Sequence, residues 1–133
     1  MPRPEAIPLS RLPHGPEAIL LTEAVRDAEA GVVRGFRDPA DRTPRVTTAD
    51  GFLPGCLLVE LMAQTAGLGL PEGGCAVVAG MTNVRVHRDA SAAERIDVRA
   101  RLHRSLGLLF VFSCRASADG EVLADGEITL RRT

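Results

Sequence analysis

The middle of the chain is apolar at nearly every position. Residues 56–70 are rich in Leu, Met and Ala, and the prolines Pro54 and Pro71 bracket them. This length and composition predict a helix over residues 55–70, about four turns long. Because it lacks a wide polar face, we expect this helix to be buried on all sides.

The second half of the chain alternates between apolar and polar residues, which is typical of half-buried strands. Asp119-Gly120 is a two-residue hairpin signal between the last two strands. The predicted strands are 76–88, 96–103, 108–116 and 122–131. We expect them to form an antiparallel meander.

The first third of the chain has weaker patterns. Residues 1–16 contain several prolines and predict an irregular arm. Two short apolar runs, 18–21 and 31–36, predict the strands of a hairpin, and residues 37–50 predict a long loop before the helix. Strands, one central helix and a long antiparallel run indicate the α+β class, with a sheet wrapped around the helix.

Composition supports one globular domain over residues 1–133. Hydrophobic residues make up 45% and charged residues 25% of the chain, as in ordinary folded proteins. The net charge of −1 gives no reason to expect a nucleic-acid or membrane partner. Every cation is an arginine, so a lysine nucleophile is excluded.

The three cysteines are isolated and have no zinc-ligand spacing, so we expect neither a metal site nor a disulfide. No segment is typical of a signal peptide or a membrane span. We therefore expect a cytoplasmic protein.

Glu60 is the anomalous residue of the predicted helix, because an unpaired buried carboxylate is costly. Gln64 lies four residues later and therefore on the same face, with Cys56 one turn before Glu60 and Gly67 about one turn after Gln64. Periodicity alone leaves two interpretations open. This narrow polar stripe is either a solvent-facing edge or a functional site.

The start of the helix also bears on chemistry. Pro54 and Gly55 precede free backbone N–H groups at the positive end of the helix dipole. Such groups polarise a thioester carbonyl in the manner of an oxyanion hole. The simpler interpretation is that Pro-Gly only begins a helix.

Two motifs together resemble a known family. Leu12-Pro13-His14 near the start, and the run from Leu53-Pro54-Gly55 to Ala63-Gln64, are similar to the β-hydroxyacyl-acyl carrier protein dehydratases of the FabA/FabZ group. Residues 84–88 and 119–122 also fit the layout of that family. The resemblance implies a hotdog fold, in which an antiparallel sheet curls around one long helix.

The resemblance also implies roles for individual residues. Glu60 matches the carboxylate that handles the 3-hydroxyl, and the Gly55 N–H matches the group that binds the thioester carbonyl. Gln64 matches the glutamine on the same helix face. Candidate substrate contacts are Gln64, Cys56, Val46 and Pro54.

The family normally forms a dimer with an acyl tunnel at the interface. We therefore expect a homodimer or higher homo-oligomer, joined edge to edge through a strand. The expected ligand is an acyl thioester on the phosphopantetheine of acyl carrier protein or of coenzyme A, with no further cofactor. Candidate cations for its phosphates are Arg85, Arg88, Arg99 and Arg101, although solvated strand positions explain them equally simply.

One position departs from the family pattern. The family places a histidine fourteen residues before the helix carboxylate, and here that residue is Val46, which cannot accept a proton. For His14 we expect a structural hydrogen-bonding role. His87 and His103 lie on predicted strands, where surface or interstrand positions are the default.

Three functions therefore compete. The first is a (3R)-hydroxyacyl-acyl carrier protein dehydratase-like protein of fatty-acid or polyketide-type metabolism, with a degenerate site, that acts on or binds an acyl thioester. The second is a hotdog thioesterase that uses Glu60. The third is a non-catalytic acyl-binding or partner subunit, because a fold by itself fixes no activity. Without the loop histidine, we expect ordinary dehydratase activity to be weak or absent.

Overall fold

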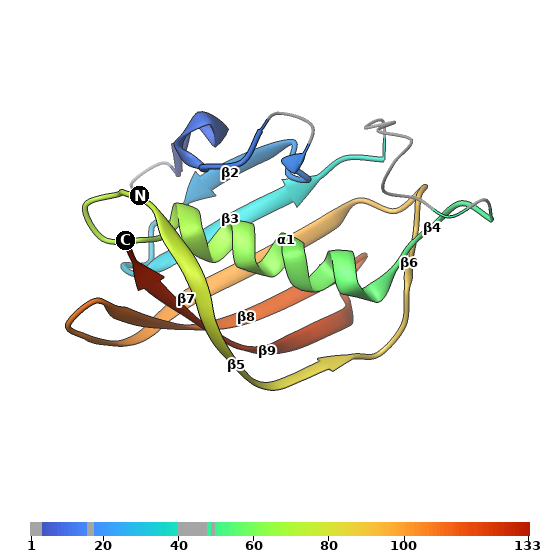
Figure 1. Ribbon diagram of the computed structural model, residues 1–133. Coiled ribbons are helices and arrows are strands. Elements are labelled where there is room, and N and C mark those ends of the chain that lie inside the picture. Colours follow the sequence, from blue (N-terminus) through green and yellow to red (C-terminus); the bar gives the residue numbers. More distant parts are fainter. Residues whose placement is uncertain (1–3, 16–17, 40–47, 49) are drawn as a thin grey trace.

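The computed structural model describes residues 4–15, 18–39, 48 and 50–133. One helix, α1 (Gly55–Leu68), lies across a seven-stranded antiparallel sheet that curls around it (Figure 1). The sheet order is β1-β2-β3-β7-β8-β9-β5, and a separate two-stranded ladder joins β4 to β6. The strands are β1 (Glu5–Ala6), β2 (Glu23–Arg26), β3 (Val32–Arg37), β4 (Phe52–Leu53), β5 (Ala76–Val86), β6 (Ala90–Ser91), β7 (Ile96–Leu106), β8 (Leu109–Ala118) and β9 (Glu121–Arg132).

The core lies between α1 and the concave face of the sheet. Leu58, Leu61 and Met62 of the helix are fully buried, and so is Phe112 of β8. Gly35 of β3 lets the helix approach closely, because a Cβ at this position would collide with side-chain atoms of Thr65. The predicted α+β class with a sheet wrapped around one helix is confirmed, and the architecture is the hotdog fold.

Several boundaries differ from the sequence prediction. The helix begins at Gly55 as expected but ends at Leu68, two residues early. The arm is not irregular throughout, because β1 pairs with β2 and residues Leu9–Arg11 form a 3-10 turn.

The run 18–21 was wrongly predicted as a strand, since the hairpin strand that pairs with β3 is Glu23–Arg26. Leu20 and Leu21 are apolar because they are buried in the core. Their hydrophobicity reflects packing rather than membership of a strand.

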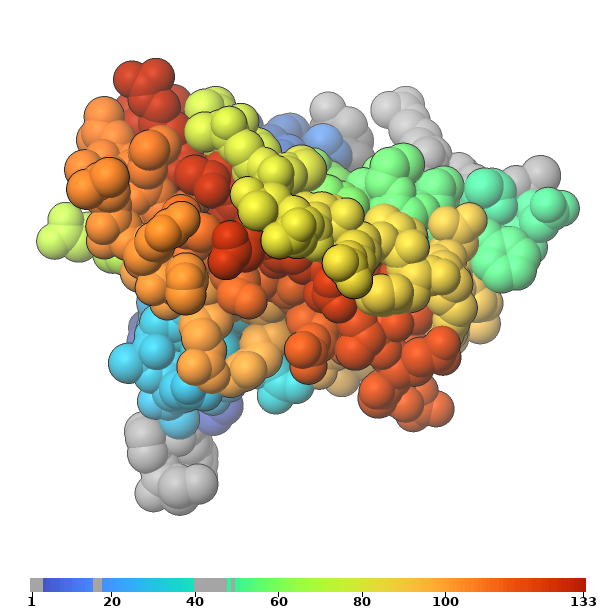
Figure 2. All heavy atoms as spheres, turned by 90° about the horizontal axis from the view of Figure 1, so that it is seen from below, coloured from blue at the N-terminus to red at the C-terminus, as the bar shows by residue number. Residues whose placement is uncertain are grey.

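The second half is not a simple meander. Strands β7, β8 and β9 follow one another in the sheet, but β5 crosses to the far side and pairs with β9. It therefore forms an edge of the sheet, with one strand neighbour. The side chains of Val77, Val78 and Met81 are about half exposed, and β5 lies uncovered along the surface in Figure 2.

In the part of the chain that is described, no helix is both long and apolar enough to span a membrane. The predicted loop 37–50 lies largely outside the described residues, as does Val46.

Candidate active site

A cavity of about 370 Å³ lies between the N-terminal arm, one face of α1 and strand β5. Its walls are mostly apolar, with a small number of polar side chains among them, as is usual for sites that bind small molecules. The lining residues are Arg11, Leu12, Pro13, His14, Glu60, Ala63, Gln64, Gly67, Gly74, Ala76, Val77, Val78 and Leu130.

The helix contributes to this cavity because one of its faces is open. Glu60, Ala63 and Gly67 follow one another at helical spacing and are only partly buried. Ala63 and Gly67 have small side chains, so they leave room beside the helix. The expectation that the helix is buried on all sides was therefore wrong, since β5 and the arm do not close over this face.

Glu60 is held at the polar end of the cavity by two neighbours. Its Oε1 atom lies 3.1 Å from Nε2 of His14 and accepts a hydrogen bond of 3.1 Å from Nε2 of Gln64. Its side chain is 40% exposed. Periodicity left open whether Glu60 faces solvent or belongs to a functional site. In the structure, Glu60 is at an exposed edge of the helix and also lines a cavity.

Gln64 is held in one orientation by its hydrogen bonds. Its side chain is buried, its Oε1 accepts the Leu20 N–H at 2.9 Å, and its Nε2 donates to the Ala18 carbonyl at 2.8 Å. These partners fix which end of the amide carries the N–H groups. The remaining N–H therefore points at Glu60, so the arm and the helix together orient the carboxylate.

His14 of the N-terminal arm also lines the cavity. It was expected to make a structural hydrogen bond, and its bond in the structure is to Glu60, the one carboxylate among the described residues that lines the cavity. Its second ring nitrogen, Nδ1, is buried and has no hydrogen-bond partner among the described residues. The Leu12-Pro13-His14 motif carried the signal, but only the fold shows that it lies against residues 46 positions later.

The backbone N–H groups at the start of α1 were expected to be free, but one of them has a hydrogen-bond partner. The Gly55 N–H is not free, because it donates to Oδ1 of Asp89 at 2.8 Å. A carboxylate at this end of a helix satisfies an orphan donor and interacts favourably with the dipole. Glycine is required here by space, since a Cβ would lie 2.5 Å from Cγ1 of Val86.

An ion-pair cluster holds the segment that carries Asp89. Arg88 donates two bonds of 2.9 Å to Glu94 and further bonds to Glu121. The hydrogen bonds from Arg88 lower the pKa of Glu94 to about 2 and also lower the pKa of Glu121. Arg88, one of the candidate phosphate ligands, is therefore already engaged with two carboxylates.

The remaining predicted residues do not join the cavity. Cys56 is exposed and Pro54 is the N-cap residue of α1, and neither lines the cavity. Gly55 and Glu60 are five residues apart, which separates them by about 140° around a helix. Gly55 is not among the residues that line the cavity, whereas Glu60 is.

Among residues 4–15, 18–39, 48 and 50–133, no group of three potential ligand side chains is placed to hold a metal ion. Cys114 is buried against the helix, and burial raises the pKa of its thiol to about 12.

Comparison with known proteins places this geometry in a family context. No family model matches the chain. The 3-hydroxyacyl-[acyl-carrier-protein] dehydratase FabZ of Rhizobium johnstonii is 26% identical over 126 residues, covering 88% of this chain and 81% of the relative. FabZ of Agrobacterium fabrum is 28% identical over the same shares. The chain is a distant homologue of the FabZ dehydratases.

Solved structures share the fold of this chain. A chain of the dehydratase heterocomplex ApeI:P from Xenorhabdus doucetiae matches with a TM-score of 0.81 at 24% identity, over 96% of this chain and 91% of that one. A hypothetical thioesterase with coenzyme A from Streptococcus pneumoniae matches with a TM-score of 0.66 at 14% identity, over 80% and 82%. At these identities the structures support the hotdog fold alone.

Proposed function

We propose that this FabZ-like protein eliminates water from a 3-hydroxyacyl thioester, with Glu60 and His14 as its acid–base pair. The observation that carries the proposal is the 3.1 Å contact between Nε2 of His14 and Oε1 of Glu60 at the polar end of a largely apolar cavity. A cavity of about 370 Å³ suits an acyl chain, and an imidazole beside a carboxyl group supplies a base and an acid.

The proposed reaction balances within this pair. In the proposed step, Nε2 of neutral His14 accepts the proton from C2 of the substrate, because Nδ1 is buried, and the acid form of Glu60 donates its proton to the leaving 3-hydroxyl. The products are a 2-enoyl thioester and water. The proton then returns from His14 to Glu60 along the hydrogen bond that joins them, which restores the resting state without another proton donor.

Gln64 supports this role by positioning Glu60. Its amide orientation is set by Leu20 and Ala18, so it donates to the carboxyl group in every protonation state. The carbonyl-binding role of Gly55 remains a prediction from the resemblance, because Asp89 accepts its N–H.

The proposed substrate carrier is the phosphopantetheine of acyl carrier protein or of coenzyme A. The names of the FabZ relatives support the acyl carrier protein, and the fold neighbour with coenzyme A supports the second carrier only as an analogy of fold.

We further propose that the free edge of β5 pairs with a second hotdog chain. This edge has one strand neighbour and exposes Val77, Val78 and Met81, and an uncovered apolar edge strand favours association. The second chain is an identical copy in the simplest assembly.

A second candidate is a partner subunit that supplies Glu60 to a mixed site. The resemblance is in its favour, because it implies a histidine at the position where this chain has Val46, and the similar Xenorhabdus chain is part of a dehydratase heterocomplex. In that case, the purified protein alone is inactive and a second hotdog subunit restores the reaction.

The test is an assay of the purified protein with 3-hydroxyacyl and saturated acyl thioesters, which monitors enoyl absorbance and free thiol. Glu60→Gln is expected to abolish enoyl formation, since a placed acid or base contributes about 10²- to 10⁴-fold. The matched control is Glu72→Gln, an exposed carboxylate with no partner among the described residues. Release of thiol from saturated thioesters, lost in Glu60→Gln, would instead support the thioesterase function.

His14→Asn separates a base from a merely positioning residue. If His14 takes the proton, the variant loses the acidic limb of the pH profile of kcat/KM as well as most of the rate. If His14 only holds Glu60, the rate falls while the shape of the profile is kept. The second result would contradict the base assigned here.

A further inference from the structure

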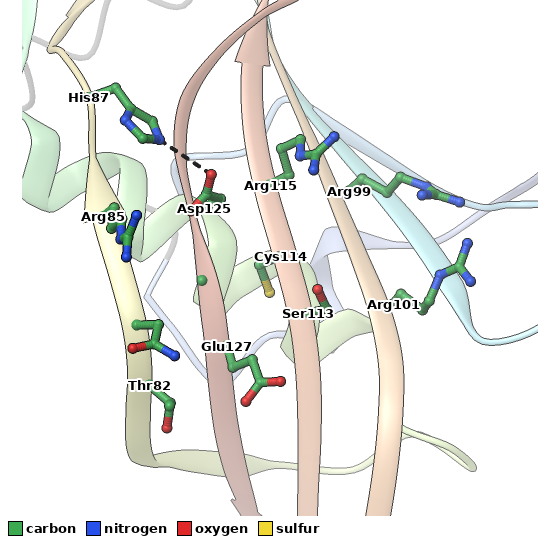
Figure 3. Close-up of a pocket in the computed structure, with 12 residues that line it drawn as sticks. Thr82, Arg85, His87, Arg99, Arg101, Ser113, Cys114, Arg115, Asp125 and Glu127 are labelled. Atoms are coloured by element: carbon green, nitrogen blue, oxygen red, sulfur yellow. Dashed lines mark hydrogen bonds and ion pairs between the residues drawn. The ribbon is translucent and has the colours of Figure 1, made fainter.

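The face of the sheet turned away from α1 carries a groove of about 510 Å³ that reaches from β5 to β7 (Figure 3). Four arginines line it, against the two carboxylates Asp125 and Glu127. The arginines are Arg85, Arg99, Arg101 and Arg115. This local excess of positive charge contrasts with a chain whose net charge is −1.

The strand register sets like charges against each other on this face. Arg34 of β3 is directly opposite Arg99 of β7, and Arg99 is directly opposite Arg115 of β8. Side chains in directly opposite positions are about 5 Å apart at Cβ, and like charges there are destabilising. Like charges meet only across β3, β7 and β8, because Asp125 of β9 is opposite both Arg115 and Arg85.

The neighbouring carboxylates neutralise only part of this charge. Arg99 and Arg101 share a single carboxylate, that of Glu29, at 2.8 and 2.6 Å. Arg34 has Asp97 as its own partner at 2.5 Å. Two guanidinium groups therefore depend on one acid, which lies in the turn between β2 and β3.

Arg115 has no hydrogen bond or ion pair with any described residue. Its opposite neighbour on β9 is Asp125, but that carboxylate contacts His87 of β5 at 3.3 Å instead, as the dashed line in Figure 3 shows. A guanidinium group that stays unpaired next to an acid leaves its N–H donors available to a ligand.

Four side chains form a compact block around this group. Arg99 faces Arg115 and Arg101 faces Ser113 across the β7–β8 ladder. The block measures about 5 Å between strands and about 7 Å along them, from standard strand spacings. Ser113 is small and adds a hydroxyl beside Arg115, while the guanidinium groups of Arg99 and Arg101 extend away from it toward Glu29 (Figure 3).

We propose that the block of Arg99, Arg101, Ser113 and Arg115 binds the phosphate group of a small phosphorylated ligand. Arginine binds phosphate oxygens through paired N–H donors, and such charge-assisted bonds are among the stronger ones in proteins. The ligand's phosphate is either part of an organic molecule of the coenzyme A type or free inorganic phosphate. The site lies on the opposite side of the sheet from Glu60 and does not depend on the proposed reaction.

The experiment is a calorimetric titration of the full chain with inorganic phosphate, pyrophosphate and coenzyme A. Saturable binding of at least one probe is expected, and Arg115→Gln is expected to weaken it by about tenfold or more, as for loss of one charge-assisted bond. The matched control is Arg104→Gln, which removes an exposed arginine of β7 outside the groove, and it is expected to change the affinity less than about twofold.

The three probes distinguish the two sources. Tighter binding of coenzyme A than of the inorganic anions, weakened in Arg115→Gln, assigns the site to an organic phosphate, and equal or tighter binding of inorganic phosphate assigns it to the free anion. Glu60→Gln is expected to leave the binding of inorganic phosphate and pyrophosphate unchanged, since its cavity is on the other side of the sheet. The thioester assay of this variant is a separate readout, so failure of either proposal is recognised independently.

Four results would overturn the proposal. They are the absence of saturable binding in a protein with a normal melting transition, equal losses in Arg115→Gln and Arg104→Gln, loss of inorganic phosphate binding in Glu60→Gln, and binding of poly-glutamate, titrated as a fourth probe, without binding of any phosphate probe. The last result would indicate an acidic protein as the partner of this face.

Discussion

The two faces of the sheet differ in how far their polar side chains are paired with hydrogen-bond partners. On the inner side, Glu60 has two polar neighbours and Gln64 uses both ends of its amide. On the outer side, arginine faces arginine across β3, β7 and β8, and Arg115 has no partner among the described residues. The inner site is held in place by hydrogen bonds, whereas the outer one retains charge that the fold does not need.

This difference indicates which residues contribute to both stability and function, and which contribute to function alone. Unpaired polar atoms are costly in a partly buried cavity, so a carboxylate kept there must be held. Water screens charge on an exposed face, and an uncompensated arginine row costs little there. Changes on the inner side should therefore cost activity and stability together, while changes on the outer side should cost binding only.

The largest expected effect is on acyl-chain recognition. Ala63→Phe fills the cavity beside the helix, so a long acyl chain loses room for about four methylene groups. At about 0.8 kcal/mol for each group, this is roughly 3 kcal/mol, or about 100-fold in kcat/KM. Short-chain thioesters are expected to react nearly as in the parent protein.

The chain-length comparison has a matched control. Ala93→Phe adds the same side chain at an exposed loop position and should leave both chain lengths unaffected. Equal losses for short and long chains in Ala63→Phe would mean that the cavity is not the acyl site.

The next effect is on stability. Gln64→Leu removes the acceptor of the buried Leu20 N–H and both donor bonds to Ala18 and Glu60. An unsatisfied buried group costs about 1–3 kcal/mol, so the free energy of unfolding in urea should fall by about that amount. Thr65→Val, on the same helix, is the control, because its hydroxyl bonds only a helix carbonyl and its loss should cost much less.

The smallest effect has the opposite sign. Arg115→Gln relieves the repulsion from Arg99 and breaks no bond to a described residue. The free energy of unfolding is expected to stay the same or rise by up to about 0.5 kcal/mol at low salt, and the gain should shrink at high salt. A clear loss of stability would show that Arg115 belongs to the structural framework of the sheet.

The helix and the strands of the second half were predictable from the sequence because their patterns are local. The apolar run with flanking prolines located the start of α1, and alternation located β7, β8 and β9. The position of β5 beside β9 was not predictable in this way, since strand order depends on long-range pairing. Leu20 and Leu21 misled the prediction because buried loop residues and strand residues are equally apolar.

The site was predictable in part. The stripe of Glu60 and Gln64 followed from helical spacing, and both line the cavity. Two contacts were not predictable, because each joins distant segments: His14 with Glu60, and Asp89 with the Gly55 N–H. The block of Arg99, Arg101, Ser113 and Arg115 was not predictable either, because Arg99 and Arg115 become neighbours only through the register of β7 and β8.

The most direct test of the inner site is a crystal structure of the protein with a 3-hydroxyacyl pantetheine amide, a stable mimic of the thioester. The account predicts the 3-hydroxyl within hydrogen-bond distance of the Glu60 carboxyl group, C2 facing His14, and the acyl chain along Ala63, Gly67 and Val78. A mimic bound with its hydroxyl away from Glu60, or bound outside this cavity, would contradict it.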